Sequence, residues 1–584
     1  MLSGDRDQIH TRPDWTNNYY HHLALNGSHW VNNDVMLSGN AYYRKSNRHT
    51  KNGDLYESGM TDNRGDDRVS TVGHEIYGNA LSCNPDTEDG ATECELVGST
   101  MNTTHTKQSN FGLGGQATFN QDFMGKKNQF IVGTGFDYSL IRFKQYERVN
   151  ISGQSEADDL SVNGNNVVDE GDGINNTVFD SSRQPSFDGV GVLPQTQTTG
   201  LTGKQWTASL FATDTLSLND KWHVNAGVRY NHTKVDNDDT LRGAASPRTL
   251  TAVDDYKRLN PSIGITHTPT DRLSVFGTYS ESSRAPTAIE LGCSNPEFGC
   301  LLPSAMADDP PLKQVVAKTY DFGARGALTD EVKWNASIYH AMNHQDLQFI
   351  RAGDSTSRGY YSNVGRTQRQ GLDLGLSGQH DKFKWSSSYS YIRATFDSDF
   401  SLVNSANSSA PNSIDEDPAE DDPNRNIYEV RKGNRMPSIP AHQFKARLQY
   451  DVTPKWSVGS NLVYFSEQYV LGNENNKHQA NTADCLISGS LRGNKAACGS
   501  GKISDYTVVN LDTQYNFGGG WKAFAKAINI FDNDYYVAGR LAETMFDASG
   551  AYGGEIKSRG VIPGAPRAAW IGVRYEFGGA PEAK

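Results

Sequence analysis

Apolar and polar residues alternate along much of this chain. From Phe444 to Tyr450, every second residue is apolar and the residues between are polar or charged. A polar break at 453–455 is followed by Trp456, Val458 and Leu462, which continue the apolar phase. Because successive side chains of a strand point to opposite faces, two such limbs around a short polar break predict a β-hairpin with a tight turn.

The same unit recurs throughout the chain. Matching limbs flank short breaks at 32–34, 125–127, 219–221, 269–271, 328–330, 380–382, 453–455 and 518–520, and one more limb covers 570–577. The first recognisable strand begins at Tyr19. The pattern therefore predicts an all-β fold of about eight antiparallel hairpins and one further strand, or about 17 strands.

The connections between these limbs alternate in length. The turns within hairpins are short, whereas the links between hairpins run over 48–108, 150–202, 286–313, 397–438 and 471–504. Short turns at one rim and long loops at the other are typical of transmembrane β-barrels of the outer membrane, with short periplasmic turns and long extracellular loops. A soluble β-sandwich or propeller is the alternative, but it does not explain why so many return limbs begin with Trp, as at Trp222, Trp334, Trp385, Trp456 and Trp521.

The polar composition of the chain is compatible with a transmembrane barrel. With 584 residues, 36% hydrophobic content and a net charge of −13, the chain resembles a large soluble protein. It contains no apolar run of roughly 18 residues that could span a bilayer as a helix. A barrel with a wet interior needs no apolar core, however, and the 27 Tyr, 23 Phe and 57 Gly residues suit strands with aromatic girdles.

The six cysteines form three close pairs in polar links. They are Cys83 and Cys94, Cys293 and Cys300, and Cys485 and Cys498. Short-range pairs in loops predict three local disulfides formed in an oxidising compartment. Metal binding is the weaker alternative, because no CxxC or Cys/His cluster accompanies any pair.

Several segments resemble the barrel of TonB-dependent outer-membrane receptors. They are residues 283–287 (SRAPT), 309–313 (DPPLK), 320–326 (YDFGARG), 361–365 (YSNVG), 370–373 (QGLD), 436–442 (MPSIPAH) and 528–536 (INIFDNDYY). Each motif alone is weak, but their order and spacing extend the resemblance over essentially the whole chain.

The resemblance implies a 22-stranded barrel, a plug domain before it, and energised uptake of a scarce nutrient through the TonB–ExbB–ExbD system. Counting back from the last strand, we expect residues 1–18 to be part of a loop, 19–577 an incomplete barrel and 578–584 a tail. Met1 is followed at once by polar residues, without the pattern of a signal peptide. We therefore expect a fragment that lacks about five strands, the plug and the signal peptide.

Two sets of residues are candidate sites. Arg284 lies where the resemblance places a strand-to-loop transition, so a ligand role competes with a structural one. Haem receptors of the family carry a histidine between motifs similar to those at 284–286 and 309–312, and no histidine lies between Pro286 and Asp309.

A second candidate is a calcium-binding loop with oxygen ligands Asn163, Asn165, Asp169 and Asp172, and the alternative is a solvated loop. The acidic run 415–422 is read as a solvated segment, with divalent bridging at the cell surface as the minor alternative.

The sequence predicts a receptor in the Gram-negative outer membrane and not an enzyme, because no Ser/His/Asp order suggests a catalytic site. The expected ligand is a ferric siderophore, since that class is common in the family. Oligosaccharide, cobalamin or haem uptake and a plugless passive pore are the alternatives. Expected partners are outer-membrane lipid, lipopolysaccharide and TonB–ExbB–ExbD, with no nucleic acid. Calcium is the single cofactor considered.

Overall fold

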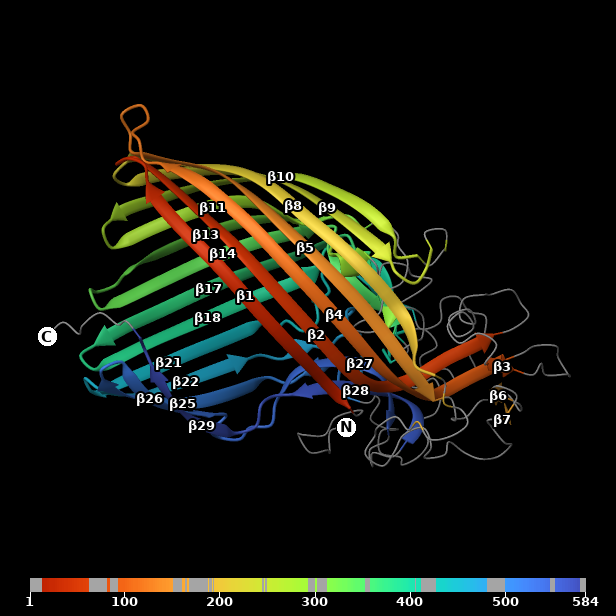
Figure 1. Cartoon of the computed structure of the whole chain (residues 1–584). Helices are drawn as coiled ribbons and strands as arrows, with labels where there is room; N and C mark the ends of the chain where they lie inside the picture. The colour runs from red at the N-terminus through yellow and green to blue at the C-terminus, as the bar shows by residue number, and fades with distance from the viewer. Residues whose placement is uncertain are drawn as a thin grey trace.

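A computed structural model describes most of the chain. The described residues are 13–61, 81–83, 93–150, 160–162, 165–166, 187, 192, 194–243, 246, 249–291, 300–301, 312–351, 358–404, 406–410, 427–480, 499–546 and 552–577. They form one large antiparallel sheet of 17 strands, which curls into a barrel wall (Figure 1).

Neighbouring strands of this wall follow one another in the chain. In order they are β1 (Asp14–Trp30), β2 (Val35–Thr61), β4 (Glu93–Phe119), β5 (Asn128–Asn150), β8 (Thr196–Asn219), β9 (Trp222–Asp239), β10 (Ala252–Thr270), β11 (Leu273–Arg284), β13 (Val315–Ala327), β14 (Val332–His344), β17 (Arg366–His380), β18 (Phe383–Phe396), β21 (His442–Thr453), β22 (Trp456–Phe465), β25 (Tyr506–Gly518), β26 (Trp521–Ile528) and β29 (Ala568–Tyr575). These are the eight hairpins and the single strand expected from the alternation, so the all-β barrel prediction is confirmed.

Smaller elements occupy the long connections. They are β3 (Leu81–Cys83) with β6 (Leu160–Val162) and β7 (Asn165–Asn166); β12 (Cys300–Leu301) with β15 (Leu347–Arg351) and β16 (Arg358–Asn363); β19 (Phe400–Val403) with β20 (Ile427–Val430); β23 (Gln468–Tyr469) with β24 (Lys502–Ile503); β27 (Tyr536–Phe546) with β28 (Tyr552–Pro563); and the four-residue helix α2 (Ala288–Leu291).

Side chains of the short breaks build the tight turns. The carbonyl oxygen of the Asn32 side chain accepts hydrogen bonds from the backbone N–H groups of Asp34 and Val35 at 2.9 and 2.8 Å. Asn219 does the same for Lys221 and Trp222 at 2.9 and 3.0 Å. Asn side chains favour such local bonds, and this is why these breaks end one strand and start the next.

The two edge strands of the wall are β1 and β29. Among the described residues, β1 pairs only with β2 and β29 only with β26. All 17 residues of β1 are exposed. The strand begins at Asp14 and not at Tyr19 as expected, because residues 14–18 pair in register with 48–52 of β2. The expected loop over 1–18 is to this extent wrong.

The strands of the first half extend far into the links that were expected to be loops. β2 and β4 stay paired as far as Thr61 opposite Glu93, so much of the 48–108 link is a two-stranded ribbon. The β27–β28 hairpin was likewise not expected. Outside a membrane neither face of a ribbon needs to be apolar, so the period-two signal fades while the backbone pairing continues.

The two faces of the wall differ in chemistry. Large apolar side chains are exposed on one face, as at Leu113, Leu210, Leu259 and Ile571. The polar residues between them face the interior of the barrel, as the alternation requires. The described residues contain no helix long and apolar enough to cross a membrane.

A buried apolar cluster fills part of the interior near the long-loop end. Phe143, Leu201 and Val235 of the wall pack there with Ala288 and Leu291 of α2, and Leu250, Leu312, Val315 and Leu347 complete the cluster. Connections between strands therefore fold inward and cover the wall of β5, β8 and β9 from inside.

Candidate functional site

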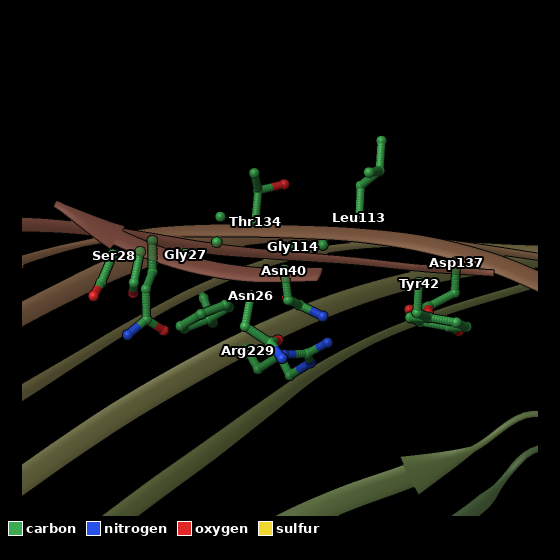
Figure 2. A pocket seen from close by; sticks show the side chains of 16 residues that line it. Asn26, Gly27, Ser28, Asn40, Tyr42, Leu113, Gly114, Thr134, Asp137 and Arg229 are labelled. Atoms are coloured by element: carbon green, nitrogen blue, oxygen red, sulfur yellow. The ribbon is translucent and has the colours of Figure 1, made fainter. Parts of the chain in front are cut away.

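The inner wall of the first half carries a polar hollow of about 630 Å³. Residues from β1, β2, β4, β5, β8 and β9 line it, among them Asn26, Asn40, Asp137, Phe211 and Arg229. Figure 2 shows Leu113 on the opposite side of the sheet from Asn26, Asn40 and Arg229. The hollow therefore opens to the interior and not to the outer, apolar face.

Arg229 is the one residue that lines this hollow and two neighbouring ones of about 440 and 300 Å³. Its Nε donates to the Asn231 side chain at 2.9 Å, and its Nη2 donates to Ser209 Oγ at 2.8 Å. The guanidinium carbon lies 5.4 Å from the centroid of the Phe211 ring. Neutral partners orient this cation without neutralising it, which leaves its charge available to an anion in the lumen.

A second polar pair lies across the hollow. The Tyr42 hydroxyl donates to Asp137 Oδ1 at 2.6 Å from two strands away. Gly112 of β4 lies between them in register, and a Cβ there would come within 2.3 Å of the Tyr42 ring and 2.7 Å of Asp137. The glycine is required for this contact, because any side chain would occupy the space of the Tyr42 ring.

The neighbouring hollow continues the polar lining toward β10 and β11. Arg258 Nη2 donates to Glu281 Oε2 at 2.6 Å, and the Asn260 side chain donates to Ser283 Oγ at 3.1 Å. Here a carboxylate already neutralises the cation. Arg229 and Arg258 therefore differ in what they offer a ligand.

The structure gives Arg284 a contact at the start of α2. Its Nη1 donates to Glu290 Oε2 at 2.6 Å. Glu290 and Thr287 form reciprocal side-chain to backbone bonds of 2.8 and 3.2 Å, which is the capping box of a helix N-terminus. Arg284 also lines the 300 Å³ hollow that Arg229 lines, so the predicted residue and Arg229 lie along one lumen wall.

The same carboxylate acts on a neighbouring phenol. Burial raises the pKa of Tyr361, the Glu290 carboxylate adds to the shift, and Arg284 opposes it. The two members of the Arg284–Glu290 pair thus act in opposite directions on the pKa of Tyr361.

The other predicted site residues are only partly described. Cys83, Cys94 and Cys300 lie in β3, β4 and β12, while Cys293, Cys485 and Cys498 lie outside the described residues. Asn165 lies in β7, and Asn163, Asp169, Asp172 and the acidic run 415–422 lie outside as well. The three disulfides and the calcium loop stay predictions. Within the described ranges, no group of three or more His, Cys, Asp or Glu side chains is placed to hold a metal ion.

A lumenal arginine of the second half has a carboxylate partner. Arg447 of β21 donates through both terminal nitrogens to the Asp512 carboxylate of β25, at 2.8 and 2.9 Å. The Asn461 side chain donates to the same carboxylate at 3.3 Å. The Asp512 carboxylate therefore neutralises the Arg447 cation, whereas Arg229 has only neutral partners.

No motif or spacing in the sequence singles out Arg229. It is one polar residue in an ordinary alternating limb, and only the register of β8, β9 and β10 brings Ser209, Phe211 and Asn260 around it.

An antiparallel wall with an apolar outer face, a polar lumen and short turns at one end defines an outer-membrane β-barrel. The family model described as TonB dependent receptor-like, beta-barrel matches residues 2–530. The chain belongs to this family, whose members are receptors and transporters of the Gram-negative outer membrane.

Known relatives share limited sequence identity with this chain. The probable TonB-dependent siderophore receptor PiuA of Acinetobacter baumannii is 24% identical over 263 residues, which is 45% of this chain and 31% of the relative. The probable TonB-dependent receptor BfrD of Bordetella pertussis is 22% identical over 268 residues, 45% of this chain and 30% of the relative. The matches thus cover about a third of these relatives' own length.

Solved structures of the same class share the fold. The A. baumannii siderophore receptor PiuA superposes with a TM-score of 0.56 at 16% identity, covering 96% of this chain and 65% of that one. The ferric-catecholate import receptor Fiu of E. coli K12 gives 0.54 at 15%, covering 98% and 66%. The pyoverdine receptor FpvA of Pseudomonas aeruginosa gives 0.55 at 14%, covering 97% and 63%.

Proposed function

We propose that this chain forms the barrel wall of a receptor that imports a ferric siderophore across the outer membrane. The relatives support this ligand class: PiuA is named as a siderophore receptor, Fiu as a ferric-catecholate import receptor, and FpvA as a pyoverdine receptor. Energised uptake would require TonB, ExbB and ExbD acting through a plug domain of the kind that the family resemblance implies.

The observation that carries the proposal is Arg229 in the lumen wall. A guanidinium held over an aromatic ring, with amide and hydroxyl groups around it, suits an anionic ligand with planar groups. Ferric complexes of catecholates are of this kind, since the deprotonated ligand leaves net negative charge around the metal.

The proposal is tested by uptake of radiolabelled ferric siderophores in a strain whose own gene is deleted and replaced by variants. In Arg229→Gln, loss of the lumenal charge is expected to raise KM for an anionic ferric complex roughly tenfold, a loss typical of one charge-assisted contact. Arg229→Lys keeps the charge but not the planar fork, so an intermediate KM is expected.

Lys221→Gln in the exposed β8–β9 turn is the matched control, and its uptake is expected to equal that of the native protein. Native uptake of every ferric siderophore tried by the Arg229→Gln strain would remove Arg229 from the site. No growth defect of the deletion strain on any iron source would overturn iron as the cargo.

The rival function is a passive pore, which needs no energy input. Deletion of tonB separates the two: uptake by a receptor is abolished, whereas diffusion through a pore continues unchanged.

A further inference from the structure

The outer face of the first half changes its chemistry abruptly along the strands. A strand that rises about 3.3 Å per residue and tilts by about 40° climbs roughly 2.5 Å per residue, so it crosses the apolar band of about 25 Å in about ten residues. Counted from the short turns, β2, β4 and β5 leave that band near Tyr43, Phe111 and Tyr138, and Trp206 of β8 lies opposite Tyr138. These ring side chains share one face across neighbouring strands, as an aromatic girdle requires.

Beyond the girdle the outward positions of these long strands turn basic. The phase of the outward aromatic residues continues into Lys45, Lys51, Lys107, Arg142 and Lys144, and also into Lys204, which lies opposite Asp236 of β9. At the outward positions of 45–51, 103–109, 140–144 and 200–204, which the structure describes, there is no Asp or Glu. The chain as a whole carries a net charge of −13, so this basic patch runs against its average.

The centre of the basic patch is a hollow of about 570 Å³. Lys107 lies directly opposite Arg142, and His105 lies opposite Lys144. All four residues line the hollow, together with Thr103, Tyr146 and Gln195. In the described part of the chain, no carboxylate pairs with Lys107, Arg142 or Lys144.

This arrangement is unfavourable by itself. Like charges directly opposite on neighbouring strands repel, and no carboxylate of the described residues forms an ion pair with them here. The next strands show the alternative: outward Lys257 of β10 is 3.0 Å from Asp255, and His232 of β9 is 2.7 Å from the same carboxylate. An anion that bridges several cations would remove the repulsion at the hollow.

We propose that the basic patch around Lys107, Arg142 and Lys144 binds the phosphate groups of a glycolipid of the outer leaflet, of the lipid A class. The position just beyond the girdle is the level of the lipid headgroups, and charge-assisted bonds from Lys and Arg are the strong contacts to phosphate. The site is on the lipid side of the wall, so it does not depend on the ligand proposed for the lumen.

The test compares the native protein with K107Q/R142Q/K144Q. The control K257Q/K384Q/K522Q removes the same charge from cations that already have carboxylate partners. Each refolded protein is titrated with bisphosphorylated lipid A and with dephosphorylated lipid A in detergent micelles, and native mass spectrometry counts the bound lipid.

The native protein and the control are expected to bind the bisphosphorylated lipid alike, and the patch variant roughly tenfold more weakly. The dephosphorylated lipid is expected to bind weakly to all three proteins. The single variants K107R and K144R keep the charge and are expected to retain native binding. If the triple variant does not assemble, the single variant R142Q replaces it. Its affinity for bisphosphorylated lipid A is expected to be about threefold lower, which on a logarithmic scale is about half of the effect of the triple variant.

Equal binding of bisphosphorylated lipid A by the native protein and the patch variant would overturn the proposal. Equal binding of the two lipids by the native protein would do so too, since only acyl contacts would then matter. Inorganic phosphate that binds at the patch, without any binding of lipid A, would show a free anion site and would overturn the lipid as its source.

Discussion

The first and second halves of the wall both cross the membrane, but their strands differ in length. The strands β1, β2, β4, β5, β8 and β9 have 17 to 27 residues, whereas β21, β22, β25, β26 and β29 have 8 to 13. About ten residues are enough to cross the apolar band. The surplus length of the first half therefore lies outside the membrane, where it forms the basic patch and the wall against which the inward connections pack.

In the second half, amide side chains order the long connections together with short strand pairs. We call Asn404, Asn407, Asn434, Asn473, Asn475 and Asn476 the asparagine knot. Asn473 accepts from the His478 backbone N–H at 3.0 Å and donates to the Gly501 carbonyl at 3.0 Å. Asn407 donates to the Gly472 carbonyl at 2.7 Å. Amide side chains thus add hydrogen bonds to connections whose paired strands are mostly short.

The lumenal charges show the same contrast. In the second half Arg447 and Asp512 satisfy each other, while in the first half Arg229 has only neutral partners. The two arginines therefore differ in the charge that they leave open to a ligand: Asp512 neutralises Arg447, whereas the hydrogen-bond partners of Arg229 are neutral.

The largest expected loss of stability comes from a substitution in the lumen wall of the first half. Gly112→Val should lower the free energy of unfolding by about 3 kcal/mol, because a side chain there overlaps the Tyr42 ring and forces the Tyr42–Asp137 contact apart. The measurement is a urea titration of the refolded barrel, followed by tryptophan fluorescence.

Gly115→Val is its matched control, because a Cβ at Gly115 meets nothing within 4 Å. The control is expected to leave the midpoint nearly unchanged. An equal loss in both variants would mean that the fault lies in β4 pairing and not in the space that Tyr42 needs.

A smaller effect is expected from the lumenal arginines. Arg447→Gln should lower the free energy of unfolding by about 1 kcal/mol, a value reduced for the partial exposure of the pair, because Asp512 loses its bidentate partner. Arg229→Gln should change it by less than about 0.5 kcal/mol, since its partners are neutral and can turn to water. The same urea titration measures both.

Arg574→Gln provides the exposed control, with 70% of its side chain accessible and Glu576 at 3.3 Å. Should Arg229→Gln prove as destabilising as Arg447→Gln, the contrast between the two arginines would be wrong.

The smallest expected effect concerns pH at the asparagine knot. Burial raises the pKa of Glu474, and the hydrogen bonds from Tyr428 and the Gly472 N–H oppose the shift. Burial lowers the pKa of His478, and Arg559 adds to that shift while the Gly499 carbonyl opposes it. A raised acid pKa stabilises the knot at low pH and is lost as pH rises through it; a lowered histidine pKa stabilises at high pH and is lost as pH falls through it.

The Glu474 contribution is complete only below the ordinary pKa of a glutamic acid, and the His478 contribution only above the ordinary pKa of a histidine, so the two oppose each other in the pH range between. Glu474→Gln should remove the loss on the alkaline side and leave the acid side as it is. Hydrogen exchange of the 470–480 amides, corrected for the intrinsic rate at each pH, measures this. Glu467→Gln, at an exposed acid paired with Lys502, is the control and should keep the native profile. An unchanged alkaline limb in Glu474→Gln would exclude that carboxylate as its cause.

Much of the wall was predictable from sequence because a membrane constrains both faces of a strand. Alternation and turn residues such as Asn32 and Asn219 gave all eight hairpins, and the order of weak motifs indicated the family. Arg284 was found through its motif, but its bond to Glu290 depends on α2, which has only four residues and no periodic signal.

The sequence by itself determined the membrane-spanning strands, because each side chain there faces either the lipid or the lumen. The tertiary structure alone decided where ribbons continue beyond the membrane, how the asparagine knot closes, and which polar residues meet around Arg229 and the basic patch. These contacts join residues of strands and connections far apart in the chain, and register across strands sets them. A pattern that repeats every two residues carries no information on which residue lies opposite.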